Sequence, residues 1–307
     1  ELKNKQLAIV VPAYNEEEVI TEFIDVCYKE LNGFIKIVLY IVNDGSSDNT
    51  LLKIMTHKIF LNPTTNFKLK IINLSRNFGH QNAVTAGINN TKKEDFLCVI
   101  DVDLQDPPEV IKRLIIEQLT NDSQIIFTKR TERRGESKFK LISANFFYFL
   151  FNKISNIPIN SNSGDFFLIT RKVCSIFNKF KEKDLFIRAI LPYIGLTSST
   201  IEYSRNSRFA GKTKYPLSKM IKLSQNAIFS FSEYPIKRFF QIGAFLFFLS
   251  FFLVIHLLVI KFIYNSATPG LLFLTIIITF FSSLNFLCLW VLGEYIGRIF
   301  KESKKRP

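Results

Sequence analysis

The sequence predicts an α/β fold with a mostly parallel sheet, followed by a C-terminal two-helix transmembrane hairpin. Over roughly the first half of the chain, short apolar runs alternate with segments of helical periodicity. These apolar runs end in polar or acidic residues, and ligands bind at the carboxyl ends of the strands in open α/β sheets. Two longer runs, 239–260 and 271–292, contain no charged residue, which is typical of membrane-spanning helices.

The predicted strands are apolar runs bounded by turn residues, and the predicted helices follow them directly. The expected strands are 7–12, 35–42, 69–74, 96–100 and 125–128, and the expected helices are 19–26, 81–88 and 107–119, with one more opened by the turn-rich segment 43–50. Strands that alternate with helices form a parallel sheet covered by helices on both faces. The polar strand ends should therefore meet at one edge of the sheet.

The strand at 96–100 is followed by the most informative stretch, D-V-D-L-Q-D-P-P-E at 101–109. Asp101 and Asp103 would repel each other unless a positive charge lies between them, and a divalent cation is the natural candidate. The two prolines suit the first turn of a helix, with Asp106 as its N-cap. No G-x-G-x-x-G follows the first strand and no G-x-x-x-x-G-K-[ST] occurs, which argues against Rossmann dinucleotide and P-loop sites.

A basic loop at 129–140 precedes a short apolar segment rich in phenylalanine, at about 139–154. This segment is too short to span a bilayer, and it is interpreted as an interfacial helix with a basic flank, or else as a core helix of the soluble domain. A turn and strand follow at 163–169, where Asp165 stands among apolar residues and must be paired or functional. Another strand is expected at 201–203, before a second basic segment at 205–222.

Each of the two uncharged runs near the C-terminus would form a helix of about 33 Å, against a hydrocarbon core of about 30 Å. Basic residues precede the first run and follow the second, so both termini and the region 1–235 are expected to be cytoplasmic. The expected organisation is a cytoplasmic α/β domain at 1–214, which includes the helix at about 139–154, a juxtamembrane amphipathic segment at 215–235, the hairpin at 236–298 and a basic cytoplasmic tail at 299–307.

The composition narrows the class of protein. The chain has 307 residues, a formal net charge of +14 and a hydrophobic fraction of 48%, a combination that is unusual for a soluble domain. The four cysteines lie too far apart for a zinc motif and suggest no disulfide framework, so a reducing compartment fits. The basic segments border apolar ones, which favours contact with anionic lipid or phosphate over nucleic acid.

Five ordered motifs resemble those of glycosyltransferase family 2, and more closely those of its polyprenyl-phosphate glycosyltransferases, the bactoprenol glucosyltransferase and dolichyl-phosphate mannose synthase type. They are V-V-P-A-Y-N-E (10–16), N-D-G-S-S-D-N-T (43–50), N-L-S-R-N-F-G-H-Q (73–81), D-V-D-L-Q-D-P-P-E (101–109) and S-G-D-F (163–166). The resemblance implies a GT-A fold, a nucleotide-sugar donor, Mg²⁺ or Mn²⁺, inversion at the anomeric carbon and transfer to a lipid phosphate at the cytoplasmic face of a membrane.

The resemblance also implies roles for individual residues. Those matching the nucleotide-sugar site are Pro12, Tyr14, Glu16, Asp44, Asp101, Gln105, Arg208 and Lys214. Asp101 and Asp103 match the D-x-D metal motif. Asp103 and Asp165 match the residues to which the resemblance assigns a catalytic role. The family's R-x-x-G-E-S-K loop departs here to R-F-A-G-K-T-K (208–214), which raises its charge.

Several of these residues keep an alternative interpretation. Asp165 could act as a base, orient the sugar or acceptor, or be a structural turn acid; the acceptor phosphate is already anionic, so a base is less necessary. Asp44 could form an Asx turn, and the D-x-D acids could cap a helix. Arg130, Arg133 and Arg134 are hypotheses for the acceptor phosphate, or belong to a solvated loop.

UDP-glucose is the favoured donor and undecaprenyl phosphate the favoured acceptor, with GDP-mannose, UDP-N-acetylglucosamine and aminopentose donors open. The sequence lacks the Q-x-x-R-W signature of processive polysaccharide synthases, which indicates transfer of a single sugar. The expected location is the bacterial inner membrane, as a homo-oligomer, with no nucleic-acid partner. A membrane adaptor that kept the fold without turnover is the non-enzymatic alternative, although an adaptor has no need of the acidic motifs.

Overall fold

The computed structural model describes residues 2–91, 93–131, 163–180, 186–206 and 271–303, together with isolated helical positions between 241 and 263. The chain divides into two compact units, Glu1–Asn226 and Ala227–Pro307. Several predictions fall outside the described residues: the interfacial helix at about 139–154, the juxtamembrane segment at 215–235 and most of the first membrane helix. Four predicted site residues, Arg133, Arg134, Arg208 and Lys214, also lie outside them.

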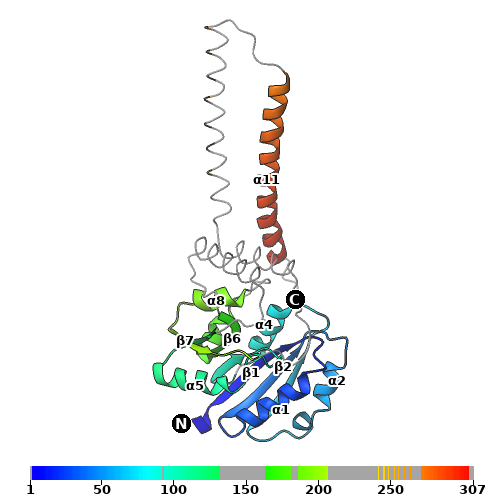
Figure 1. The fold of residues 1–307 in the computed structure, drawn as a ribbon, viewed down its shortest axis with the longest axis vertical. Coiled ribbons are helices and arrows are strands. Elements are labelled where there is room, and N and C mark those ends of the chain that lie inside the picture. Colours follow the sequence, from blue (N-terminus) through cyan, green and yellow to red (C-terminus); the bar gives the residue numbers. More distant parts are fainter. Residues whose placement is uncertain are drawn as a thin grey trace. The chain divides into compact units, whose positions relative to one another are not determined.

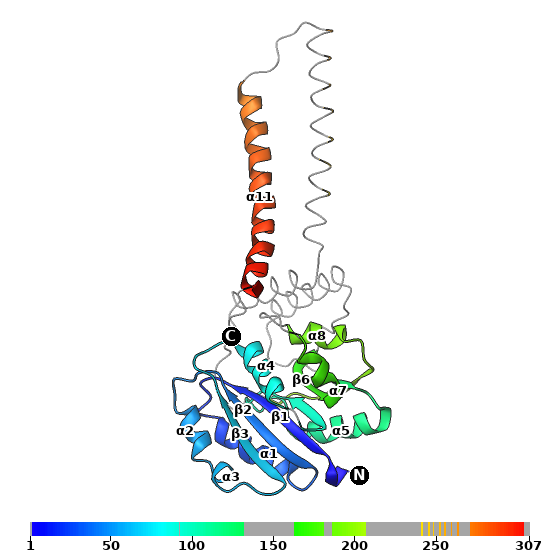
Figure 2. The same cartoon turned by 180° about the vertical axis from the view of Figure 1, so that it is seen from behind.

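The first unit is a single sheet with helices around it (Figures 1 and 2). Its strands are β1 (Gln6–Ala13), β2 (Lys36–Asn43), β3 (Phe67–Asn73), β4 (Phe96–Val99), β5 (Ile125–Arg130), β6 (Ser163–Thr170) and β7 (Ser198–Tyr203). Its helices are the 3-10 turn η1 (Leu2–Asn4), α1 (Ile20–Leu31), α2 (Thr50–Met55), α3 (Lys58–Leu61), α4 (His80–Asn90), α5 (Val110–Asn121), α7 (Arg171–Phe177) and α8 (Ile187–Tyr193).

The strands are ordered β3-β2-β1-β4-β6-β5-β7. Strands β1, β2, β3 and β4 pair in parallel, and β7 runs parallel to β5. Strand β6 is antiparallel to both of its neighbours, β4 and β5. The predicted α/β fold with a mostly parallel sheet is confirmed, and the reversed β6 is a feature that the apolar pattern did not predict.

The central strands are buried on both faces, which explains why they read as continuous apolar runs and not as alternating ones. Leu7 and Ile9 of β1 join the core beneath α1 and α5. Val10 lies on the opposite face, where Gly87 of α4 packs so closely that an added Cβ would be 2.2 Å from Val10 Cγ1. Helices thus cover both faces, as predicted.

The strand order places a topological switch point at the centre of the sheet. Strand β1 is flanked by β2 on one side and β4 on the other, so the chain winds in opposite directions from this point. Crevices at such points, at the carboxyl ends of the strands, are where open α/β sheets bind ligands. Ala13 ends β1, and Asp101 follows β4 after a single residue, Ile100.

The helix after the D-x-D stretch begins later than predicted. Helix α5 starts at Val110, and the preceding Glu109 makes no side-chain capping hydrogen bond. The prediction that Asp106 caps this helix is therefore wrong. Pro107 and Pro108 form the turn before it, with their carbonyl oxygens accepting from Val110 N and Ile111 N, and this leaves the Asp106 side chain for another purpose.

The second unit contains α11 (Leu271–Ser303), a helix of 33 residues that appears in orange to red in Figure 1. At 1.5 Å per residue it is about 50 Å long. In the part of the chain that the structure describes, it is the one helix long and apolar enough to cross a membrane, over Phe280–Gly297 with a mean hydropathy of 1.3. Large apolar side chains such as Phe286, Trp290 and Ile296 are exposed along it.

Candidate active site

The two D-x-D acids lie where predicted, at the carboxyl end of β4 beside β1. Ile100 N donates to Val10 O at 3.2 Å, which fixes the chain just before Asp101. The loop then turns sharply: Leu104 has a φ of 56°, and Gln105 N donates to Asp103 Oδ1 at 3.1 Å. This turn presents the two carboxylates from a short, well-anchored loop.

Asp165 is brought to the same place by the reversed strand β6. His80, the first residue of α4, lies between Asp165 and Asp101. Its Nε2 atom is 3.4 Å from Asp165 Oδ2 and 3.8 Å from Asp101 Oδ1. Arg188 of α8 donates from Nε to Asp165 Oδ1 at 2.7 Å and from Nη2 to Asp165 Oδ2 at 2.9 Å. Asp165 is therefore paired, one of the two outcomes that its apolar surroundings predicted.

These contacts shift the pKa values of the three groups in different directions. Burial raises the pKa of Asp101 to about 6; His80 opposes this rise, and the carboxylates of Asp106, Asp165 and Asp103 add to it. Burial alone would also raise the pKa of Asp165, but Arg188 and His80 outweigh it and hold that pKa well below its usual range. Burial would lower the pKa of His80, yet its carboxylate neighbours raise it to about 9.

Hydrogen bonds join the loops after β1, β2 and β3 to one another, and these loops carry several of the predicted nucleotide-binding residues. Asn15, with a φ of 53°, receives a hydrogen bond at Oδ1 from Ser47 N at 2.8 Å, and Glu16 N donates to Thr50 Oγ1 at 2.8 Å. Pro12 is buried in β1, whereas Tyr14 is exposed to 38%.

Asp44 holds the backbone after β3. Its side chain is buried, and its two oxygens accept from Phe78 N at 2.7 Å and Gly79 N at 2.9 Å. The next residue, Gly45, has a φ of +66°, and a Cβ there would lie 2.4 Å from the Arg76 carbonyl carbon. The carboxylate thus ties two loops together, which goes beyond the local Asx turn considered as its alternative.

A second cluster surrounds Asp106, whose side chain is fully buried. Asp106 Oδ1 accepts from the Tyr203 hydroxyl at 2.5 Å and from Arg205 Nε at 3.1 Å. Arg130, at the end of β5, places Nη2 3.7 Å from Asp106 Oδ2 and donates from Nε to the Tyr203 hydroxyl at 3.3 Å. Arg130 is therefore held by protein groups and is not part of a solvated loop.

Sequence reasoning missed four members of these clusters, namely His80, Arg188, Tyr203 and Arg205. His80 stands inside the motif N-L-S-R-N-F-G-H-Q, so its presence in a motif was the available signal. No sequence signal marked Arg188, because it lies on the short helix α8, outside every matched motif and 23 positions from its partner Asp165. Tyr203 is the last residue of β7, and Arg205 opens the basic segment 205–222, in which the matched motif begins only at Arg208.

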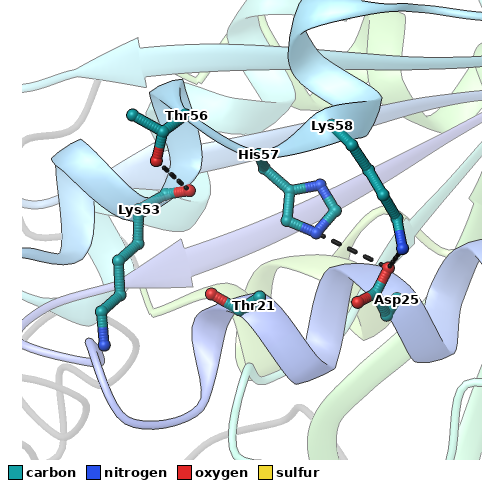
Figure 3. Close-up of a pocket in the computed structure, with 6 residues that line it drawn as sticks. All are labelled: Thr21, Asp25, Lys53, Thr56, His57 and Lys58. Atoms are coloured by element: carbon teal, nitrogen blue, oxygen red, sulfur yellow. Dashed lines mark hydrogen bonds and ion pairs between the residues drawn. The ribbon is translucent and has the colours of Figure 1, made fainter.

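A separate cavity of about 370 Å³ lies between α1 and the α2–α3 pair (Figure 3). Its lining residues are Thr21, Asp25, Lys53, Thr56, His57 and Lys58. Within the wall, Asp25 Oδ1 lies 3.0 Å from Lys58 Nζ and 3.6 Å from His57 Nε2. Lys53 donates to the backbone oxygen of Glu17 at 2.8 Å. None of the predicted site residues lines this cavity.

Comparison with known proteins gives a consistent result. The family model described as Glycosyl transferase family 2 matches residues 8–177. Uncharacterized glycosyltransferase YkcC of Bacillus subtilis (strain 168) is 40% identical, over 98% of this chain and 92% of its own length. The bactoprenol glucosyl transferase of Shigella phage SfX is 35% identical, over 98% of this chain and 97% of its own.

Among solved structures, glucosyl-3-phosphoglycerate synthase from Mycobacterium tuberculosis, crystallised with Mn²⁺, UDP and phosphoglyceric acid, aligns with a TM-score of 0.50 and 16% sequence identity. The alignment covers 73% of this chain and 76% of that one. At this identity, the likeness shows a shared fold alone.

Proposed function

The chain belongs to glycosyltransferase family 2, and from this premise we propose that it transfers a single sugar from a nucleotide sugar to a polyprenyl phosphate. It is a glycosyltransferase with a GT-A fold. The observation that carries the acceptor assignment is the near full-length relative named as a bactoprenol glucosyl transferase. In the proposed reaction, an acceptor phosphate oxygen forms a bond to the anomeric carbon with inversion, and the nucleoside diphosphate leaves with the electrons of the broken bond.

The donor set at the D-x-D loop fits a divalent cation. Burial raises the pKa of Asp101 to about 6, and the carboxylates of Asp106, Asp165 and Asp103 add to the rise, which reflects the negative potential that these neighbours produce at the loop. Carboxylate oxygens suit Mg²⁺ and Mn²⁺. Among the described residues, no group of three or more acidic, histidine or cysteine side chains could hold a metal ion. This is expected where one or two carboxylates and the substrate's phosphates share the ion.

In this proposal Asp101 and Asp103 hold the metal, which would neutralise the diphosphate as it leaves. Tyr14, Glu16, Asp44 and Gln105 are assigned to the nucleotide sugar, along with Pro12 in β1. UDP-glucose is the favoured donor, because the relatives named as bactoprenol glucosyl transferases transfer glucose by name. Arg208 and Lys214 remain predicted contacts of the diphosphate.

Asp165 is proposed to orient the substrate and stabilise positive charge, and not to act as a base. Arg188 occupies both of its oxygens, and the pKa of Asp165 is held well below its usual range. A carboxylate in this state takes up a proton poorly at neutral pH. The acceptor phosphate is already anionic and can attack without losing a proton, so the reaction does not need a base here.

The acceptor is proposed to reach the site from the cytoplasmic face of a membrane in which α11 is embedded. The apolar stretch Phe280–Gly297 supports this, and so do the basic residues Arg298 and Lys301 that follow it. Arg130 is assigned to the acceptor phosphate, as predicted; Arg133 and Arg134 keep that role as predictions.

The test is a panel of nucleotide sugars with undecaprenyl phosphate and either Mg²⁺ or Mn²⁺, using the full chain in detergent and thin-layer detection of labelled lipid. We expect one donor, UDP-glucose first, to yield a glycolipid that mild acid hydrolyses to the free sugar. If no donor labels any polyprenyl phosphate while the protein still binds nucleotide, the proposed function is wrong.

A further inference from the structure

Asp106 lies in the loop that carries the D-x-D acids, and its carboxylate contacts side chains at the ends of β5 and β7. One of its oxygens accepts from Tyr203 at 2.5 Å and from Arg205 at 3.1 Å, while Arg130 Nη2 lies 3.7 Å from the other. The carboxylate is fully buried. A single buried carboxylate therefore holds two guanidinium groups next to each other.

The exposure and charge of this cluster indicate a ligand. The side chains of Arg130 and Arg205 keep 17% and 20% of their surface accessible, against 1% for Asp106. The two arginines are thus partly exposed while Asp106 is not, and within this cluster two positive charges share one carboxylate. Paired guanidinium groups bind the oxygens of a phosphate through parallel hydrogen bonds.

The cluster is built next to the reaction site. Gly164 lies against the Arg130 guanidinium, where an added Cβ would be 2.7 Å from Nη2, and the following residue is Asp165. On the other side, Asn206 N donates to Gln105 O at 2.9 Å, which ties the residue after Arg205 to the D-x-D loop. The guanidinium pair is therefore connected through the backbone to both acidic elements of the site.

We propose that Arg205 and Arg130 together bind the phosphate monoester of the lipid acceptor, an inference that rests on the proposed function. Asp106 is then the positioning residue that holds the two guanidinium groups at the spacing a phosphate requires. The phosphate of the donor has the same chemistry. The acceptor is favoured because the Arg130 guanidinium lies against Gly164, the residue before Asp165 in β6, and not at the loops after β1, β2 and β3.

The experiment compares full-length variants in detergent by two measurements, the KM for undecaprenyl phosphate at saturating donor and the affinity for UDP with Mn²⁺. Arg205→Gln is expected to raise the acceptor KM about tenfold and to leave UDP affinity unchanged, and Arg205→Lys to recover part of the loss. Asp106→Asn should raise the acceptor KM at least as much, because both guanidinium groups lose their anchor. The matched control is Glu202→Gln, which removes an exposed partner of Lys129 on the same strands.

The inference is overturned if the acceptor KM of Arg205→Gln is no higher than that of Glu202→Gln. It is also overturned if Arg205→Gln weakens UDP binding as much as it raises the acceptor KM, because the two arginines would then bind the donor. Should Asp106→Asn not fold, Tyr203→Phe removes one of the hydrogen bonds to Asp106 and must raise the acceptor KM in the same direction. A wild-type chain that glycosylates no polyprenyl phosphate overturns the proposed function first, and the inference with it.

Discussion

Arg188 and Asp165 form a two-point contact, with Nε 2.7 Å from Oδ1 and Nη2 2.9 Å from Oδ2, across 23 positions of the sequence. This geometry fixes the plane of the carboxylate as well as its position. Asp165 comes from β6, an interior strand, and Arg188 from α8, so the contact also joins the sheet to this helix. His80 completes the arrangement from α4.

Replacing Arg188 should therefore impair turnover more than binding. We expect Arg188→Gln to lower kcat about 10- to 100-fold, because a displaced Asp165 no longer aligns the reacting groups, with a smaller change in the KM for donor. Arg188→Lys should recover only part of the rate, since a lysine cannot make the two-point contact. Steady-state kinetics of the three proteins measures this; equal kcat values in all of them would contradict the orienting role.

Asp103→Asn should abolish transfer, with a loss of more than about a hundredfold, because a metal that stabilises the leaving diphosphate is worth several kcal/mol. Excess chelator should reduce the wild-type rate to a similar level, and added Mg²⁺ or Mn²⁺ should restore it. Asp122→Asn is a suitable control, since Asp122 lies at the end of α5 with a φ of 48°, a conformation that asparagine tolerates. Full activity of Asp103→Asn, or of the wild type in chelator, would refute metal dependence.

Gly164→Ala should displace the Arg130 guanidinium, because the new Cβ would lie 2.7 Å from Nη2. The φ of Gly164 lies outside the left-handed region, so the backbone can accept alanine and the effect is confined to this contact. We expect an acceptor KM that rises about tenfold, equivalent to about 1.4 kcal/mol, with little change in thermal stability. An unchanged acceptor KM would show that Arg130 adapts without loss, or does not bind the acceptor.

His57 makes stability depend on pH at a place remote from the active site (Figure 3). Burial lowers its pKa, and Asp25 opposes that only in part. The folded protein therefore binds a proton at His57 less readily than the unfolded chain, whose histidine titrates near 6.5. Stability linked to this residue is present above that pH and decreases as the pH falls below it.

The comparison to make is thermal unfolding of wild type and His57→Asn between about pH 7 and about pH 5. Asparagine keeps an acceptor for Ile59 N, which now donates to His57 Nδ1 at 3.3 Å, so the start of α3 is preserved. The wild type should lose more stability than the variant on acidification. Parallel curves for the two proteins would rule out a contribution from His57.

The strands and the location of the site could be predicted from the sequence because both follow from local pattern. Continuous apolar runs such as Leu7–Pro12 are buried on both faces, and the chain must then expose its polar residues at their ends. Asp101 and Asp103 could be placed for the same reason. The direction of β6 could not be predicted in this way, because an apolar run is equally compatible with either orientation in a sheet.

The sequence also did not predict which side chains would contact one another when they lie far apart along the chain. Asp106 stands before two prolines and has the local pattern of a helix cap, yet in the fold it is Tyr203 and Arg205, nearly a hundred positions away, that bind it. A buried carboxylate selects partners by the distance and geometry that the fold provides, which the residues beside it do not encode. Arg188 and Asp165 escaped prediction as a pair for the same reason.

The reversal of β6 has a consequence for how the acidic residues come together. Because β5 and β6 are antiparallel neighbours, with Lys129 opposite Ser163, β6 begins at the end of the sheet where β5 finishes. The same reversal pairs Val99 of β4 with Phe167 of β6, so Asp165 stands level with the residues that follow β4. A parallel β6 would start at the opposite end of the sheet and would place Asp165 far from Asp101.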